Sequence, residues 1–415
     1  MLTQATGNRQ ETAVQHDQHH TSKPTLSTVV GRLVPDDGCA GTLLGRVWNP
    51  AGPTPGPMVV AIRADGVFDV TSHWPTVADL LDEPFPAAAL AAQAGVRIGD
   101  LEQVITNSQQ PHSASLLHFL APVDVQVIKA CGVTFADSML ERVIEERTKG
   151  DASGAAAVRE QIMAVVGSNL TGLKPGSPQA MALKAILKEQ GWWSAYLEVG
   201  IGPDAEVFTK APVLGAVGTG ARVGVRSDSL WDNPEPEVVL AVNARGETVG
   251  ITLGNDVNLR DIEGRSALLL GKAKDNNASC AIGPWIRLFD STFNIDHARQ
   301  MTVGLRVTGT DGYVLAGQSN LARISRDPLD LVLQTTSAHQ YPDGFMLFTG
   351  TLFTPTQDRG EAGAGFTHHL GDEVRIRSSW IGELRNVVDH CEGAPPWQFG
   401  VRALMRNLAA RGLLG

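Results

Sequence analysis

The spacing of apolar residues predicts helices in one stretch of the chain. Residues 137–149, DSMLERVIEERTK, carry Met139, Leu140, Val143 and Ile144 at intervals that place these side chains on one face of a helix. Two further helices are expected, over residues 155–166 and 179–188. The run that follows, GWWSAYLEV at residues 191–199, is expected to return to strand. The predicted helices therefore lie close together in the sequence.

Short apolar runs that alternate with turn residues predict that the chain is mostly β after residue 195. Three hairpins are expected there, at residues 237–253, 301–319 and 372–388. The first has its turn at residues 243–246, NARG. Nearer the N-terminus, the ADG of residues 64–66 predicts a turn between two more short strands.

Together these patterns predict an α+β fold with two domains. Residues 1–25 are polar and show neither helical nor strand periodicity, so we expect a disordered extension there. Residues 26–122 are expected to form a small α+β domain, and residues 123–415 a β-rich catalytic domain with helices packed outside it. The boundary is placed near Pro122, where a second apolar region begins.

The charge balance of the 415-residue chain disfavours polyanionic partners. Its 34 Lys and Arg residues stand against 44 Asp and Glu residues, and the formal charge of −10 opposes binding to nucleic acid or to an anionic membrane. The four cysteines include no CxxC pair, which argues against a disulfide framework or a thiolate zinc site. No apolar run approaches the roughly 20 residues of a membrane span, and the start has no apolar signal segment, so we expect a cytoplasmic protein.

Three carboxylates are predicted to meet at one end of a hairpin. Glu235 and Glu237 are two residues apart, so both side chains point to the same face if this segment is extended. Asp256 lies at the end of the strand that is expected to pair with theirs. Such close like charges repel unless a cation neutralises them, and oxygen-only ligands favour a hard divalent ion such as Mg²⁺, Ca²⁺ or Mn²⁺. The alternative is that all three are solvated edge and turn residues.

Four motifs in the chain resemble those of the fumarylacetoacetate hydrolase family. In order they are an ExE pair at residues 235–237, GNDVNLRD at 254–261, GK at 271–272 with GPW at 283–285, and TGT at 349–351. The resemblance covers residues 123–411 and implies a β-rich, fumarylacetoacetate-hydrolase-like roll that binds a divalent ion. It implies that Glu235, Glu237 and Asp256 are the metal ligands. Lys272 and Thr351 would line the substrate site.

Longer runs are similar to the branch of this superfamily that dehydrates 2-keto-3-deoxypentonates derived from xylonate or arabinonate. Such runs lie at residues 132–147, 254–284 and 339–355. This resemblance implies a hydro-lyase of non-phosphorylating pentose catabolism that uses Mg²⁺ or Mn²⁺. Its substrate would be a small 2-keto-3-deoxy sugar acid, and its product 2,5-dioxopentanoate, also called α-ketoglutarate semialdehyde. The branch also implies a homodimer or homotetramer.

One position departs from the hydrolases of this family. They place a His, followed three residues on by a Glu, where this chain has Ser138 and Glu141. Because Ser by itself is not a general base at neutral pH, this difference argues against hydrolysis. Ser138 and Glu141 also fit a capping box, which needs no catalytic role. Alternatively, residues 137–149 form a mobile lid that brings Glu141 or Glu145 over the ion as acid or base.

A lysine and several polar residues complete the predicted site. Lys272 is expected to be catalytic, either as a positive charge beside the developing enolate or as the base that takes the C3 proton. The residues expected to contact the substrate are Ser138, Lys274, Asp275 and Thr351. For Lys274 and Asp275 an exposed turn is an equal alternative. The alternatives to dehydration are hydrolysis of an acylpyruvate C–C bond and the binding of a sugar acid without turnover.

Overall fold

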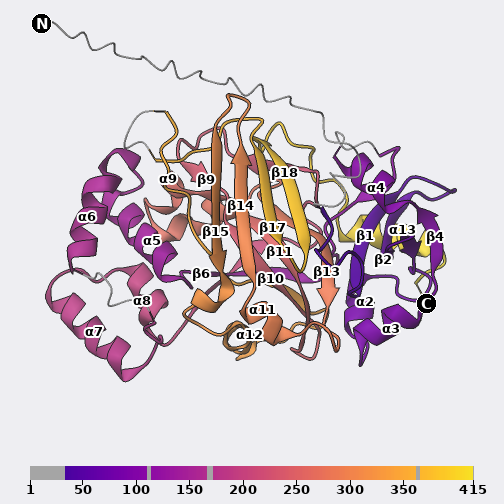
Figure 1. The fold of residues 1–415 in the computed structure, drawn as a ribbon, viewed down its shortest axis with the longest axis horizontal. Coiled ribbons are helices and arrows are strands. Elements are labelled where there is room, and N and C mark those ends of the chain that lie inside the picture. Colours follow the sequence, from indigo (N-terminus) through magenta and orange to yellow (C-terminus); the bar gives the residue numbers. More distant parts are fainter. Residues whose placement is uncertain (1–32, 110–113, 166–171, 361–364, 415) are drawn as a thin grey trace, which may run out of the picture.

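Three neighbouring regions make up the molecule (Figure 1). The computed structural model describes residues 33–109, 114–165, 172–360 and 365–414, and the extension expected at residues 1–25 lies outside them. A group of helices from residues 136–201 lies at one side, and strands occupy the middle. The N-terminal strands and helices lie at the other side, together with the C-terminal helix.

The larger sheet has 11 strands in the order β4-β3-β2-β1-β13-β11-β10-β16-β6-β7, with β5 attached to β1. Its strands are β1 (Leu43–Asn49), β2 (Gly56–Arg63), β3 (Gly66–Asp69), β4 (Val96–Gly99), β5 (His118–Phe119), β6 (Val127–Gly132), β7 (Glu206–Ala211), β10 (Pro236–Val242), β11 (Thr248–Asp256), β13 (Cys280–Leu288) and β16 (Phe345–Phe348). Because β1 pairs with β13, strands on both sides of Pro122 share one sheet. The domain boundary near Pro122 stays a prediction.

The smaller sheet has five strands in the order β15-β14-β17-β18-β8. They are β8 (Arg222–Val225), β14 (Thr302–Thr308), β15 (Val314–Asn320), β17 (Glu373–Ser378) and β18 (Gly382–His390), and a separate ribbon pairs β9 (Asp232–Asn233) with β12 (Asn258–Leu259). The hairpins predicted from the turn residues are β2–β3, β10–β11, β14–β15 and β17–β18. All four are confirmed, and so is the α+β class.

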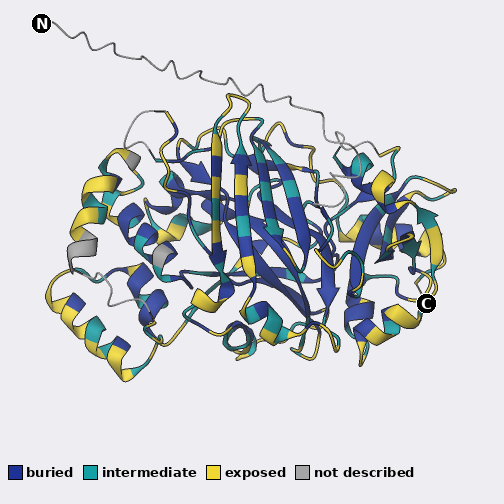
Figure 2. Cartoon of the chain, in the orientation of Figure 1, coloured by how far each residue is buried: buried dark blue, intermediate teal, exposed yellow. Residues whose placement is uncertain are grey.

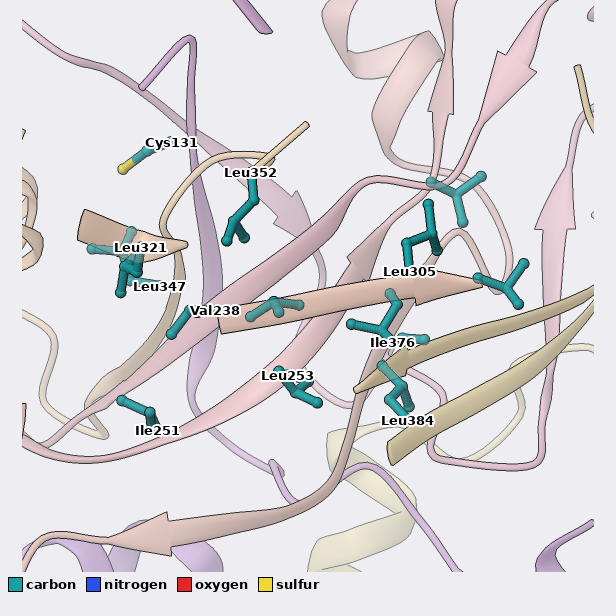
Figure 3. Packing of buried hydrophobic residues seen from close by; sticks show 14 of the residues in the cluster. Cys131, Val238, Ile251, Leu253, Leu305, Leu321, Leu347, Leu352, Ile376 and Leu384 are labelled. Carbon is teal, nitrogen blue, oxygen red and sulfur yellow. The ribbon is translucent and has the colours of Figure 1, made fainter. Parts of the chain in front are cut away.

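The main hydrophobic core lies between the two sheets (Figures 2 and 3). Leu253 of the larger sheet and Leu305 of the smaller sheet belong to it. Strand β10 is buried along its whole length, with Val238 and Leu240 in this core and Val239 in a second core. Successive side chains of a strand point to opposite faces, so a strand covered on both sides is apolar at every interior position. Packing on both faces therefore fixes β10 and the residues at its start.

The helices predicted before residue 190 are confirmed as α5 (Ala136–Thr148), α6 (Ala155–Val165) and α7 (Pro178–Glu189). The strand expected at residues 191–199 is wrong, because α8 (Ala195–Ile201) occupies this part of the chain. Ser194 caps α8 by accepting a hydrogen bond from the Leu197 amide at 3.2 Å. The buried Tyr196, Leu197 and Ile201 pack in one cluster with the apolar face of α5. Periodicity alone does not separate a short helix from a strand in such an apolar run.

The remaining helices are short. They are α2 (Val77–Leu81), α3 (Pro86–Ala92), α4 (Leu101–Ser108), α9 (Arg260–Glu263), α10 (Leu270–Lys274), α11 (Ile295–Arg299), α12 (Pro328–Thr336) and α13 (Val401–Ala410), with single 3-10 turns at Ala152–Gly154, Ala267–Leu269 and Leu321–Arg323. Helix α13 lies beside the N-terminal strands, where the Asn407 side-chain amide donates to the Pro55 carbonyl at 2.8 Å. Among the described residues, no helix is long and apolar enough to cross a membrane.

We predict that Trp285→Ala on β13 destabilises the whole chain in one transition. The Trp285 side chain is fully buried, donates to the Ile381 carbonyl at 2.9 Å and packs edge-on against Phe119 of β5 at 5.9 Å. Removing a buried Trp costs about 3–5 kcal/mol. Denaturant unfolding followed by circular dichroism measures this loss, and Trp397→Ala, at a half-exposed Trp, should cost about 1 kcal/mol or less. Two separate transitions, only one of them shifted, would contradict a jointly folded sheet.

Candidate metal centre and active site

The three predicted carboxylates meet at the paired ends of β10 and β11. Glu237 lies opposite Gly254 in this antiparallel pair, and the Asp256 amide donates to the Glu235 carbonyl at 3.1 Å. This register places Glu235, Glu237 and Asp256 at one point, where one oxygen of each lies within 4.8 Å of the others. All three residues are about 1% exposed. The geometry therefore excludes the alternative that they are solvated surface residues.

The TGT motif supports one of these carboxylates from the other side. The Gly350 amide donates to Glu237 Oε2 at 2.7 Å. Gly350 has φ of +97°, and a Cβ there would lie 2.0 Å from the Thr134 hydroxyl, so only glycine fits. Thr351 is buried, and its hydroxyl donates to the Phe353 carbonyl at 3.0 Å. The motif thus positions a backbone donor at Glu237.

Buried cations surround the carboxylates. Lys274 Nζ lies 2.5 Å from Glu235 Oε2 and 3.1 Å from Asp256 Oδ2. Lys210 Nζ lies 2.9 Å from Asp256 Oδ1, and Arg142 pairs with Glu235. Burial alone would lower the pKa of Lys274, but the Asp256 and Glu235 carboxylates outweigh it and raise that pKa. Lys210 and Arg142 were not predicted from the sequence, because the carboxylates that they contact in this centre lie far from them in the sequence.

Glu237 is the carboxylate with the least compensation. Burial raises its pKa well above the ordinary value, and the neighbouring Asp256 and Glu235 charges raise it further. Lys274 and the Gly350 amide offset only part of this effect. A further cation beside Glu237 would relieve the remaining repulsion.

The two lysines of α10 occupy different environments. Lys274 is buried against the carboxylates, whereas the Lys272 side chain is 40% exposed and pairs with Asp228 at 3.0 Å. Residues two apart on a helix do not face each other, so only one of them can reach the centre. The structure thus brings Lys274 to the carboxylates and leaves the predicted catalytic residue Lys272 at the surface. Asp275, at the C-terminal cap of α10, is exposed.

Ser138 does not cap α5. The helix begins at Ala136, two residues before Ser138, whose buried hydroxyl donates to the Phe135 carbonyl at 2.9 Å. Glu141 accepts hydrogen bonds from Arg159 at 2.9 and 3.0 Å and from Arg260 at 3.0 Å. The capping-box interpretation is therefore wrong, because the hydroxyl and the carboxylate are engaged elsewhere.

Glu145 links α5 to the centre through arginines. Its side chain is fully buried and lies 2.7 Å from Arg142 Nη1 and 2.7 Å from Arg260 Nε. Burial opposes ionisation, but the two guanidinium groups outweigh it and lower the pKa of Glu145. Arg142 also pairs with Glu235 of the carboxylate centre. Glu145 is thus an ionised carboxylate one arginine away from the predicted metal ligands.

Glu263 is a buried acid that the sequence reasoning missed. It ends α9 and lies 3.0 Å from Arg142 Nη1. Burial raises its pKa to about 7, since Arg142 offsets only part of the desolvation. One sequence signal could have found it. Glu263 lies three residues after Arg260, in the run that starts at GNDVNLRD, and this spacing places the two side chains on the same face of a helix.

The donor set fits a hard divalent cation. Three converging carboxylates offer only oxygen atoms, the ligands that Mg²⁺ and related ions prefer. Burial and the Asp256 and Glu235 charges raise the pKa of Glu237 well above its ordinary value, so a further cation beside it would be favourable. Glu235, Glu237 and Asp256 would hold the ion.

Residues 217–389 match the family model described as fumarylacetoacetate (FAA) hydrolase C-terminal. This part of the chain is therefore similar to the fumarylacetoacetate hydrolase C-terminal domain, and the resemblance inferred from the sequence is confirmed over these residues. The domain contains the three carboxylates, Lys274 and the TGT motif. Helix α5 precedes it.

Relatives with named activities are similar over part of their length. Over 193 residues, 46% of this chain, it is 33% identical to a probable 2-keto-3-deoxyxylonate dehydratase of Haloferax volcanii and spans 63% of that protein. Over 181 residues, 43% of this chain, it is 32% identical to a 2-dehydro-3-deoxy-D-arabinonate dehydratase of Saccharolobus solfataricus and spans 57% of it. The chain thus matches less than two thirds of the length of either relative.

Solved structures show the same fold. The apo form of a 2-keto-3-deoxy-D-arabinonate dehydratase superposes with a TM-score of 0.58 at 21% identity, over 84% of this chain and 99% of that one. A structure of such a dehydratase complexed with magnesium and 2,5-dioxopentanoate gives a TM-score of 0.57 at 20% identity, with the same coverage. The expected fumarylacetoacetate-hydrolase-like roll is confirmed.

We predict that Glu237→Gln abolishes the rise in melting temperature that Mg²⁺ causes. In EDTA the variant should be more stable than the wild type at neutral pH, because one of three repelling buried charges is gone. A carboxyl whose pKa is raised on folding stabilises the fold below its unfolded pKa and loses that contribution as pH rises through its folded pKa. The difference should therefore widen as the pH rises above about 4, the ordinary range of a carboxyl pKa.

Thermal melts with and without Mg²⁺ across this pH range measure both effects. Asp228→Asn, at an exposed carboxylate, is the matched control and should keep the Mg²⁺ response of the wild type. An equal Mg²⁺ response in Glu237→Gln and the wild type would contradict the assignment of Glu237 as a ligand.

Proposed function

We propose that the protein is a Mg²⁺-dependent hydro-lyase that converts a 2-keto-3-deoxypentonate, derived from xylonate or arabinonate, into 2,5-dioxopentanoate. The observation that carries this proposal is one buried cluster in which three carboxylates that fit a divalent cation lie against the Lys274 ammonium. The names of the two relatives, which are dehydratases of such acids, support the same substrate class. A cytoplasmic location and a homodimer or homotetramer remain predictions.

The reaction removes one water molecule and needs no nucleophile from outside. A base takes a proton from C3, next to the 2-oxo group, and the electron pair expels the C4 hydroxyl, which an acid protonates as it leaves. A proton shift from C5 to C3 then gives an enol that tautomerises to the 5-aldehyde. A divalent cation bound by the carboxylates would supply Lewis-acid polarisation of the 2-oxo group.

We assign the catalytic roles in this reaction to three charged residues. Lys274, protonated beside two carboxylates, supplies positive charge to the developing enolate, so we assign it the role expected of Lys272. Glu145, an ionised carboxylate next to Arg142 and Arg260, is proposed as the base that takes the C3 proton. Glu141 is proposed to protonate the leaving hydroxyl. A lid movement of α5 would bring both glutamates to the substrate.

Three further polar residues are proposed to position the substrate. The hydroxyls of Ser138 and Thr351 are buried and donate to the carbonyls of Phe135 and Phe353, so each keeps acceptor capacity for a substrate hydroxyl. Asp275 is proposed to contact the substrate from the exposed end of α10. Ser138 bonds to a backbone carbonyl and not to Glu141, which disfavours the pair that hydrolases use to activate water.

Incubation with a 2-keto-3-deoxypentonate and Mg²⁺ tests the reaction directly. We expect stoichiometric aldehyde, identified as 2,5-dioxopentanoate by NMR, and no reaction in EDTA. Cleavage of an acylpyruvate at a higher kcat/KM than dehydration would favour the hydrolase alternative. Saturable binding of the sugar acid without any product would favour a binding protein.

The two lysines of α10 provide a matched pair of variants. Lys274→Met should lower kcat by about 10²- to 10³-fold, as expected when a group that stabilises transition-state charge is lost. Lys272→Met should leave kcat within about threefold, because an exposed ion pair contributes little. Steady-state kinetics measures both values. The reverse order of effects would return the catalytic role to Lys272.

Hydrogen exchange at C3 of the substrate distinguishes the roles of the two glutamates of α5. Glu145→Gln should lower kcat by about 10²- to 10⁴-fold and stop incorporation of deuterium at C3 in D₂O, because the base is lost. Glu141→Gln should slow water loss while C3 exchange continues. Mass spectrometry of recovered substrate and product distinguishes the two effects. If both variants keep kcat within about threefold, neither residue is the acid or base.

A further inference from the structure

A cavity that none of the proposed catalytic residues lines is present near the N-terminal strands. It has a volume of about 340 Å³ and opens between β1, β5 and the segment at residues 395–399. Its walls are mainly apolar, and the rings of Trp48 and Phe399 meet edge-to-face across a centroid distance of 5.8 Å. None of the three carboxylates, and neither buried lysine, lines it. It is therefore separate from the proposed active site.

One buried cation lines this cavity. Arg46 of β1 is about 6% exposed, and its Nη1 donates to the Val123 carbonyl at 3.3 Å. Among the described residues, no carboxylate lies within ion-pairing distance of its guanidinium group. Asp124 is nearby, but its two oxygens accept the amides of Val77 at 2.6 Å and Val125 at 2.8 Å. Arg46 thus has unused donors beside an open cavity.

The energetic balance at Arg46 favours an anion. Burial lowers the pKa of Arg46, and the charge of Asp124 offsets only part of this effect. A buried charge without a paired counter-ion is costly, so a bound anion would recover stabilisation that the protein itself does not supply. The cavity gives such an anion direct access to the guanidinium group.

Three other polar groups of the cavity wall are already engaged. The indole N–H of Trp48 donates to the Ala114 carbonyl at 2.9 Å, and that of Trp397 donates to the Phe399 carbonyl at 3.2 Å. The Asn277 side-chain amide donates to the Cys391 carbonyl at 3.0 Å. A sugar acid placed here would leave most of its hydroxyls without partners, which disfavours the proposed substrate as the occupant.

We propose that this cavity binds a small monocarboxylic acid with an aromatic body, its carboxylate paired with Arg46 and its ring packed against Trp48 and Phe399. A guanidinium group recognises a carboxylate through two parallel hydrogen bonds. The cavity volume lies at the lower end of the range for small-molecule sites, which suits a single ring with a short side chain. The proposal does not depend on the activity of the carboxylate centre.

Phenylacetate and its neutral isostere phenylacetamide are the probes. Isothermal titration calorimetry on the full chain should show saturable one-to-one binding of phenylacetate, with phenylacetamide at least about tenfold weaker, as expected for the loss of a charge-assisted hydrogen-bond pair. Arg46→Met should weaken phenylacetate by a similar factor. Lys274→Met should leave phenylacetate binding unchanged, which shows that the acid does not bind at the carboxylate centre.

A second variant keeps the test decisive if Arg46→Met does not fold. Trp397→Ala removes a half-exposed side chain of the cavity wall and should weaken phenylacetate without altering the circular dichroism spectrum. Equal affinity for the acid and the amide overturns the proposal. So does loss of binding in Lys274→Met with retention in Arg46→Met. Absence of saturable binding at millimolar concentration also overturns it, including the case in which a second copy of the chain fills the cavity.

Discussion

Three carboxylates are buried at one point, and the rest of the site depends on how their mutual repulsion is compensated. The pairing of β10 with β11 brings them together, and the packing of β10 on both faces prevents them from moving apart. Lys274, Lys210 and Arg142 supply the nearest positive charges. Buried ion pairs of this kind seldom add stability, because desolvation offsets their attraction. We therefore attribute these buried ion pairs to the chemistry of the site and not to the stability of the fold.

One of the residues that compensate this repulsion also links the helical region to the sheet. Arg142 projects from α5 and contacts Glu235, Glu145 and Glu263, so the helix and the carboxylate centre share one guanidinium group. Any movement of α5 must change these contacts, and any neutralisation of Glu235 changes what holds α5 in place. A helix held by these contacts is sensitive to the charge state of the centre.

Much of this arrangement was predictable from the sequence, and the failures have physical causes. The hairpins and the carboxylate centre follow from local rules, since turn residues fix strand pairing and a spacing of two places Glu235 and Glu237 on one face. Helix α8 was missed because short apolar runs do not reveal their period. The roles of Lys272 and Lys274 depend on the rotational phase of α10, which two neighbouring lysines do not reveal. Arg142 was missed because Glu235 and Glu263, two of its three partners, lie far from it in the sequence.

The central claim is that the carboxylate cluster is a site for one hard divalent cation. Anomalous X-ray scattering from crystals soaked in Mn²⁺ tests it most directly, because this ion substitutes for Mg²⁺ on oxygen ligands and is located without reference to the protein density. The account predicts one strong peak within coordination distance of an oxygen from each of Glu235, Glu237 and Asp256. No peak there, or a peak bound by other residues, would contradict it.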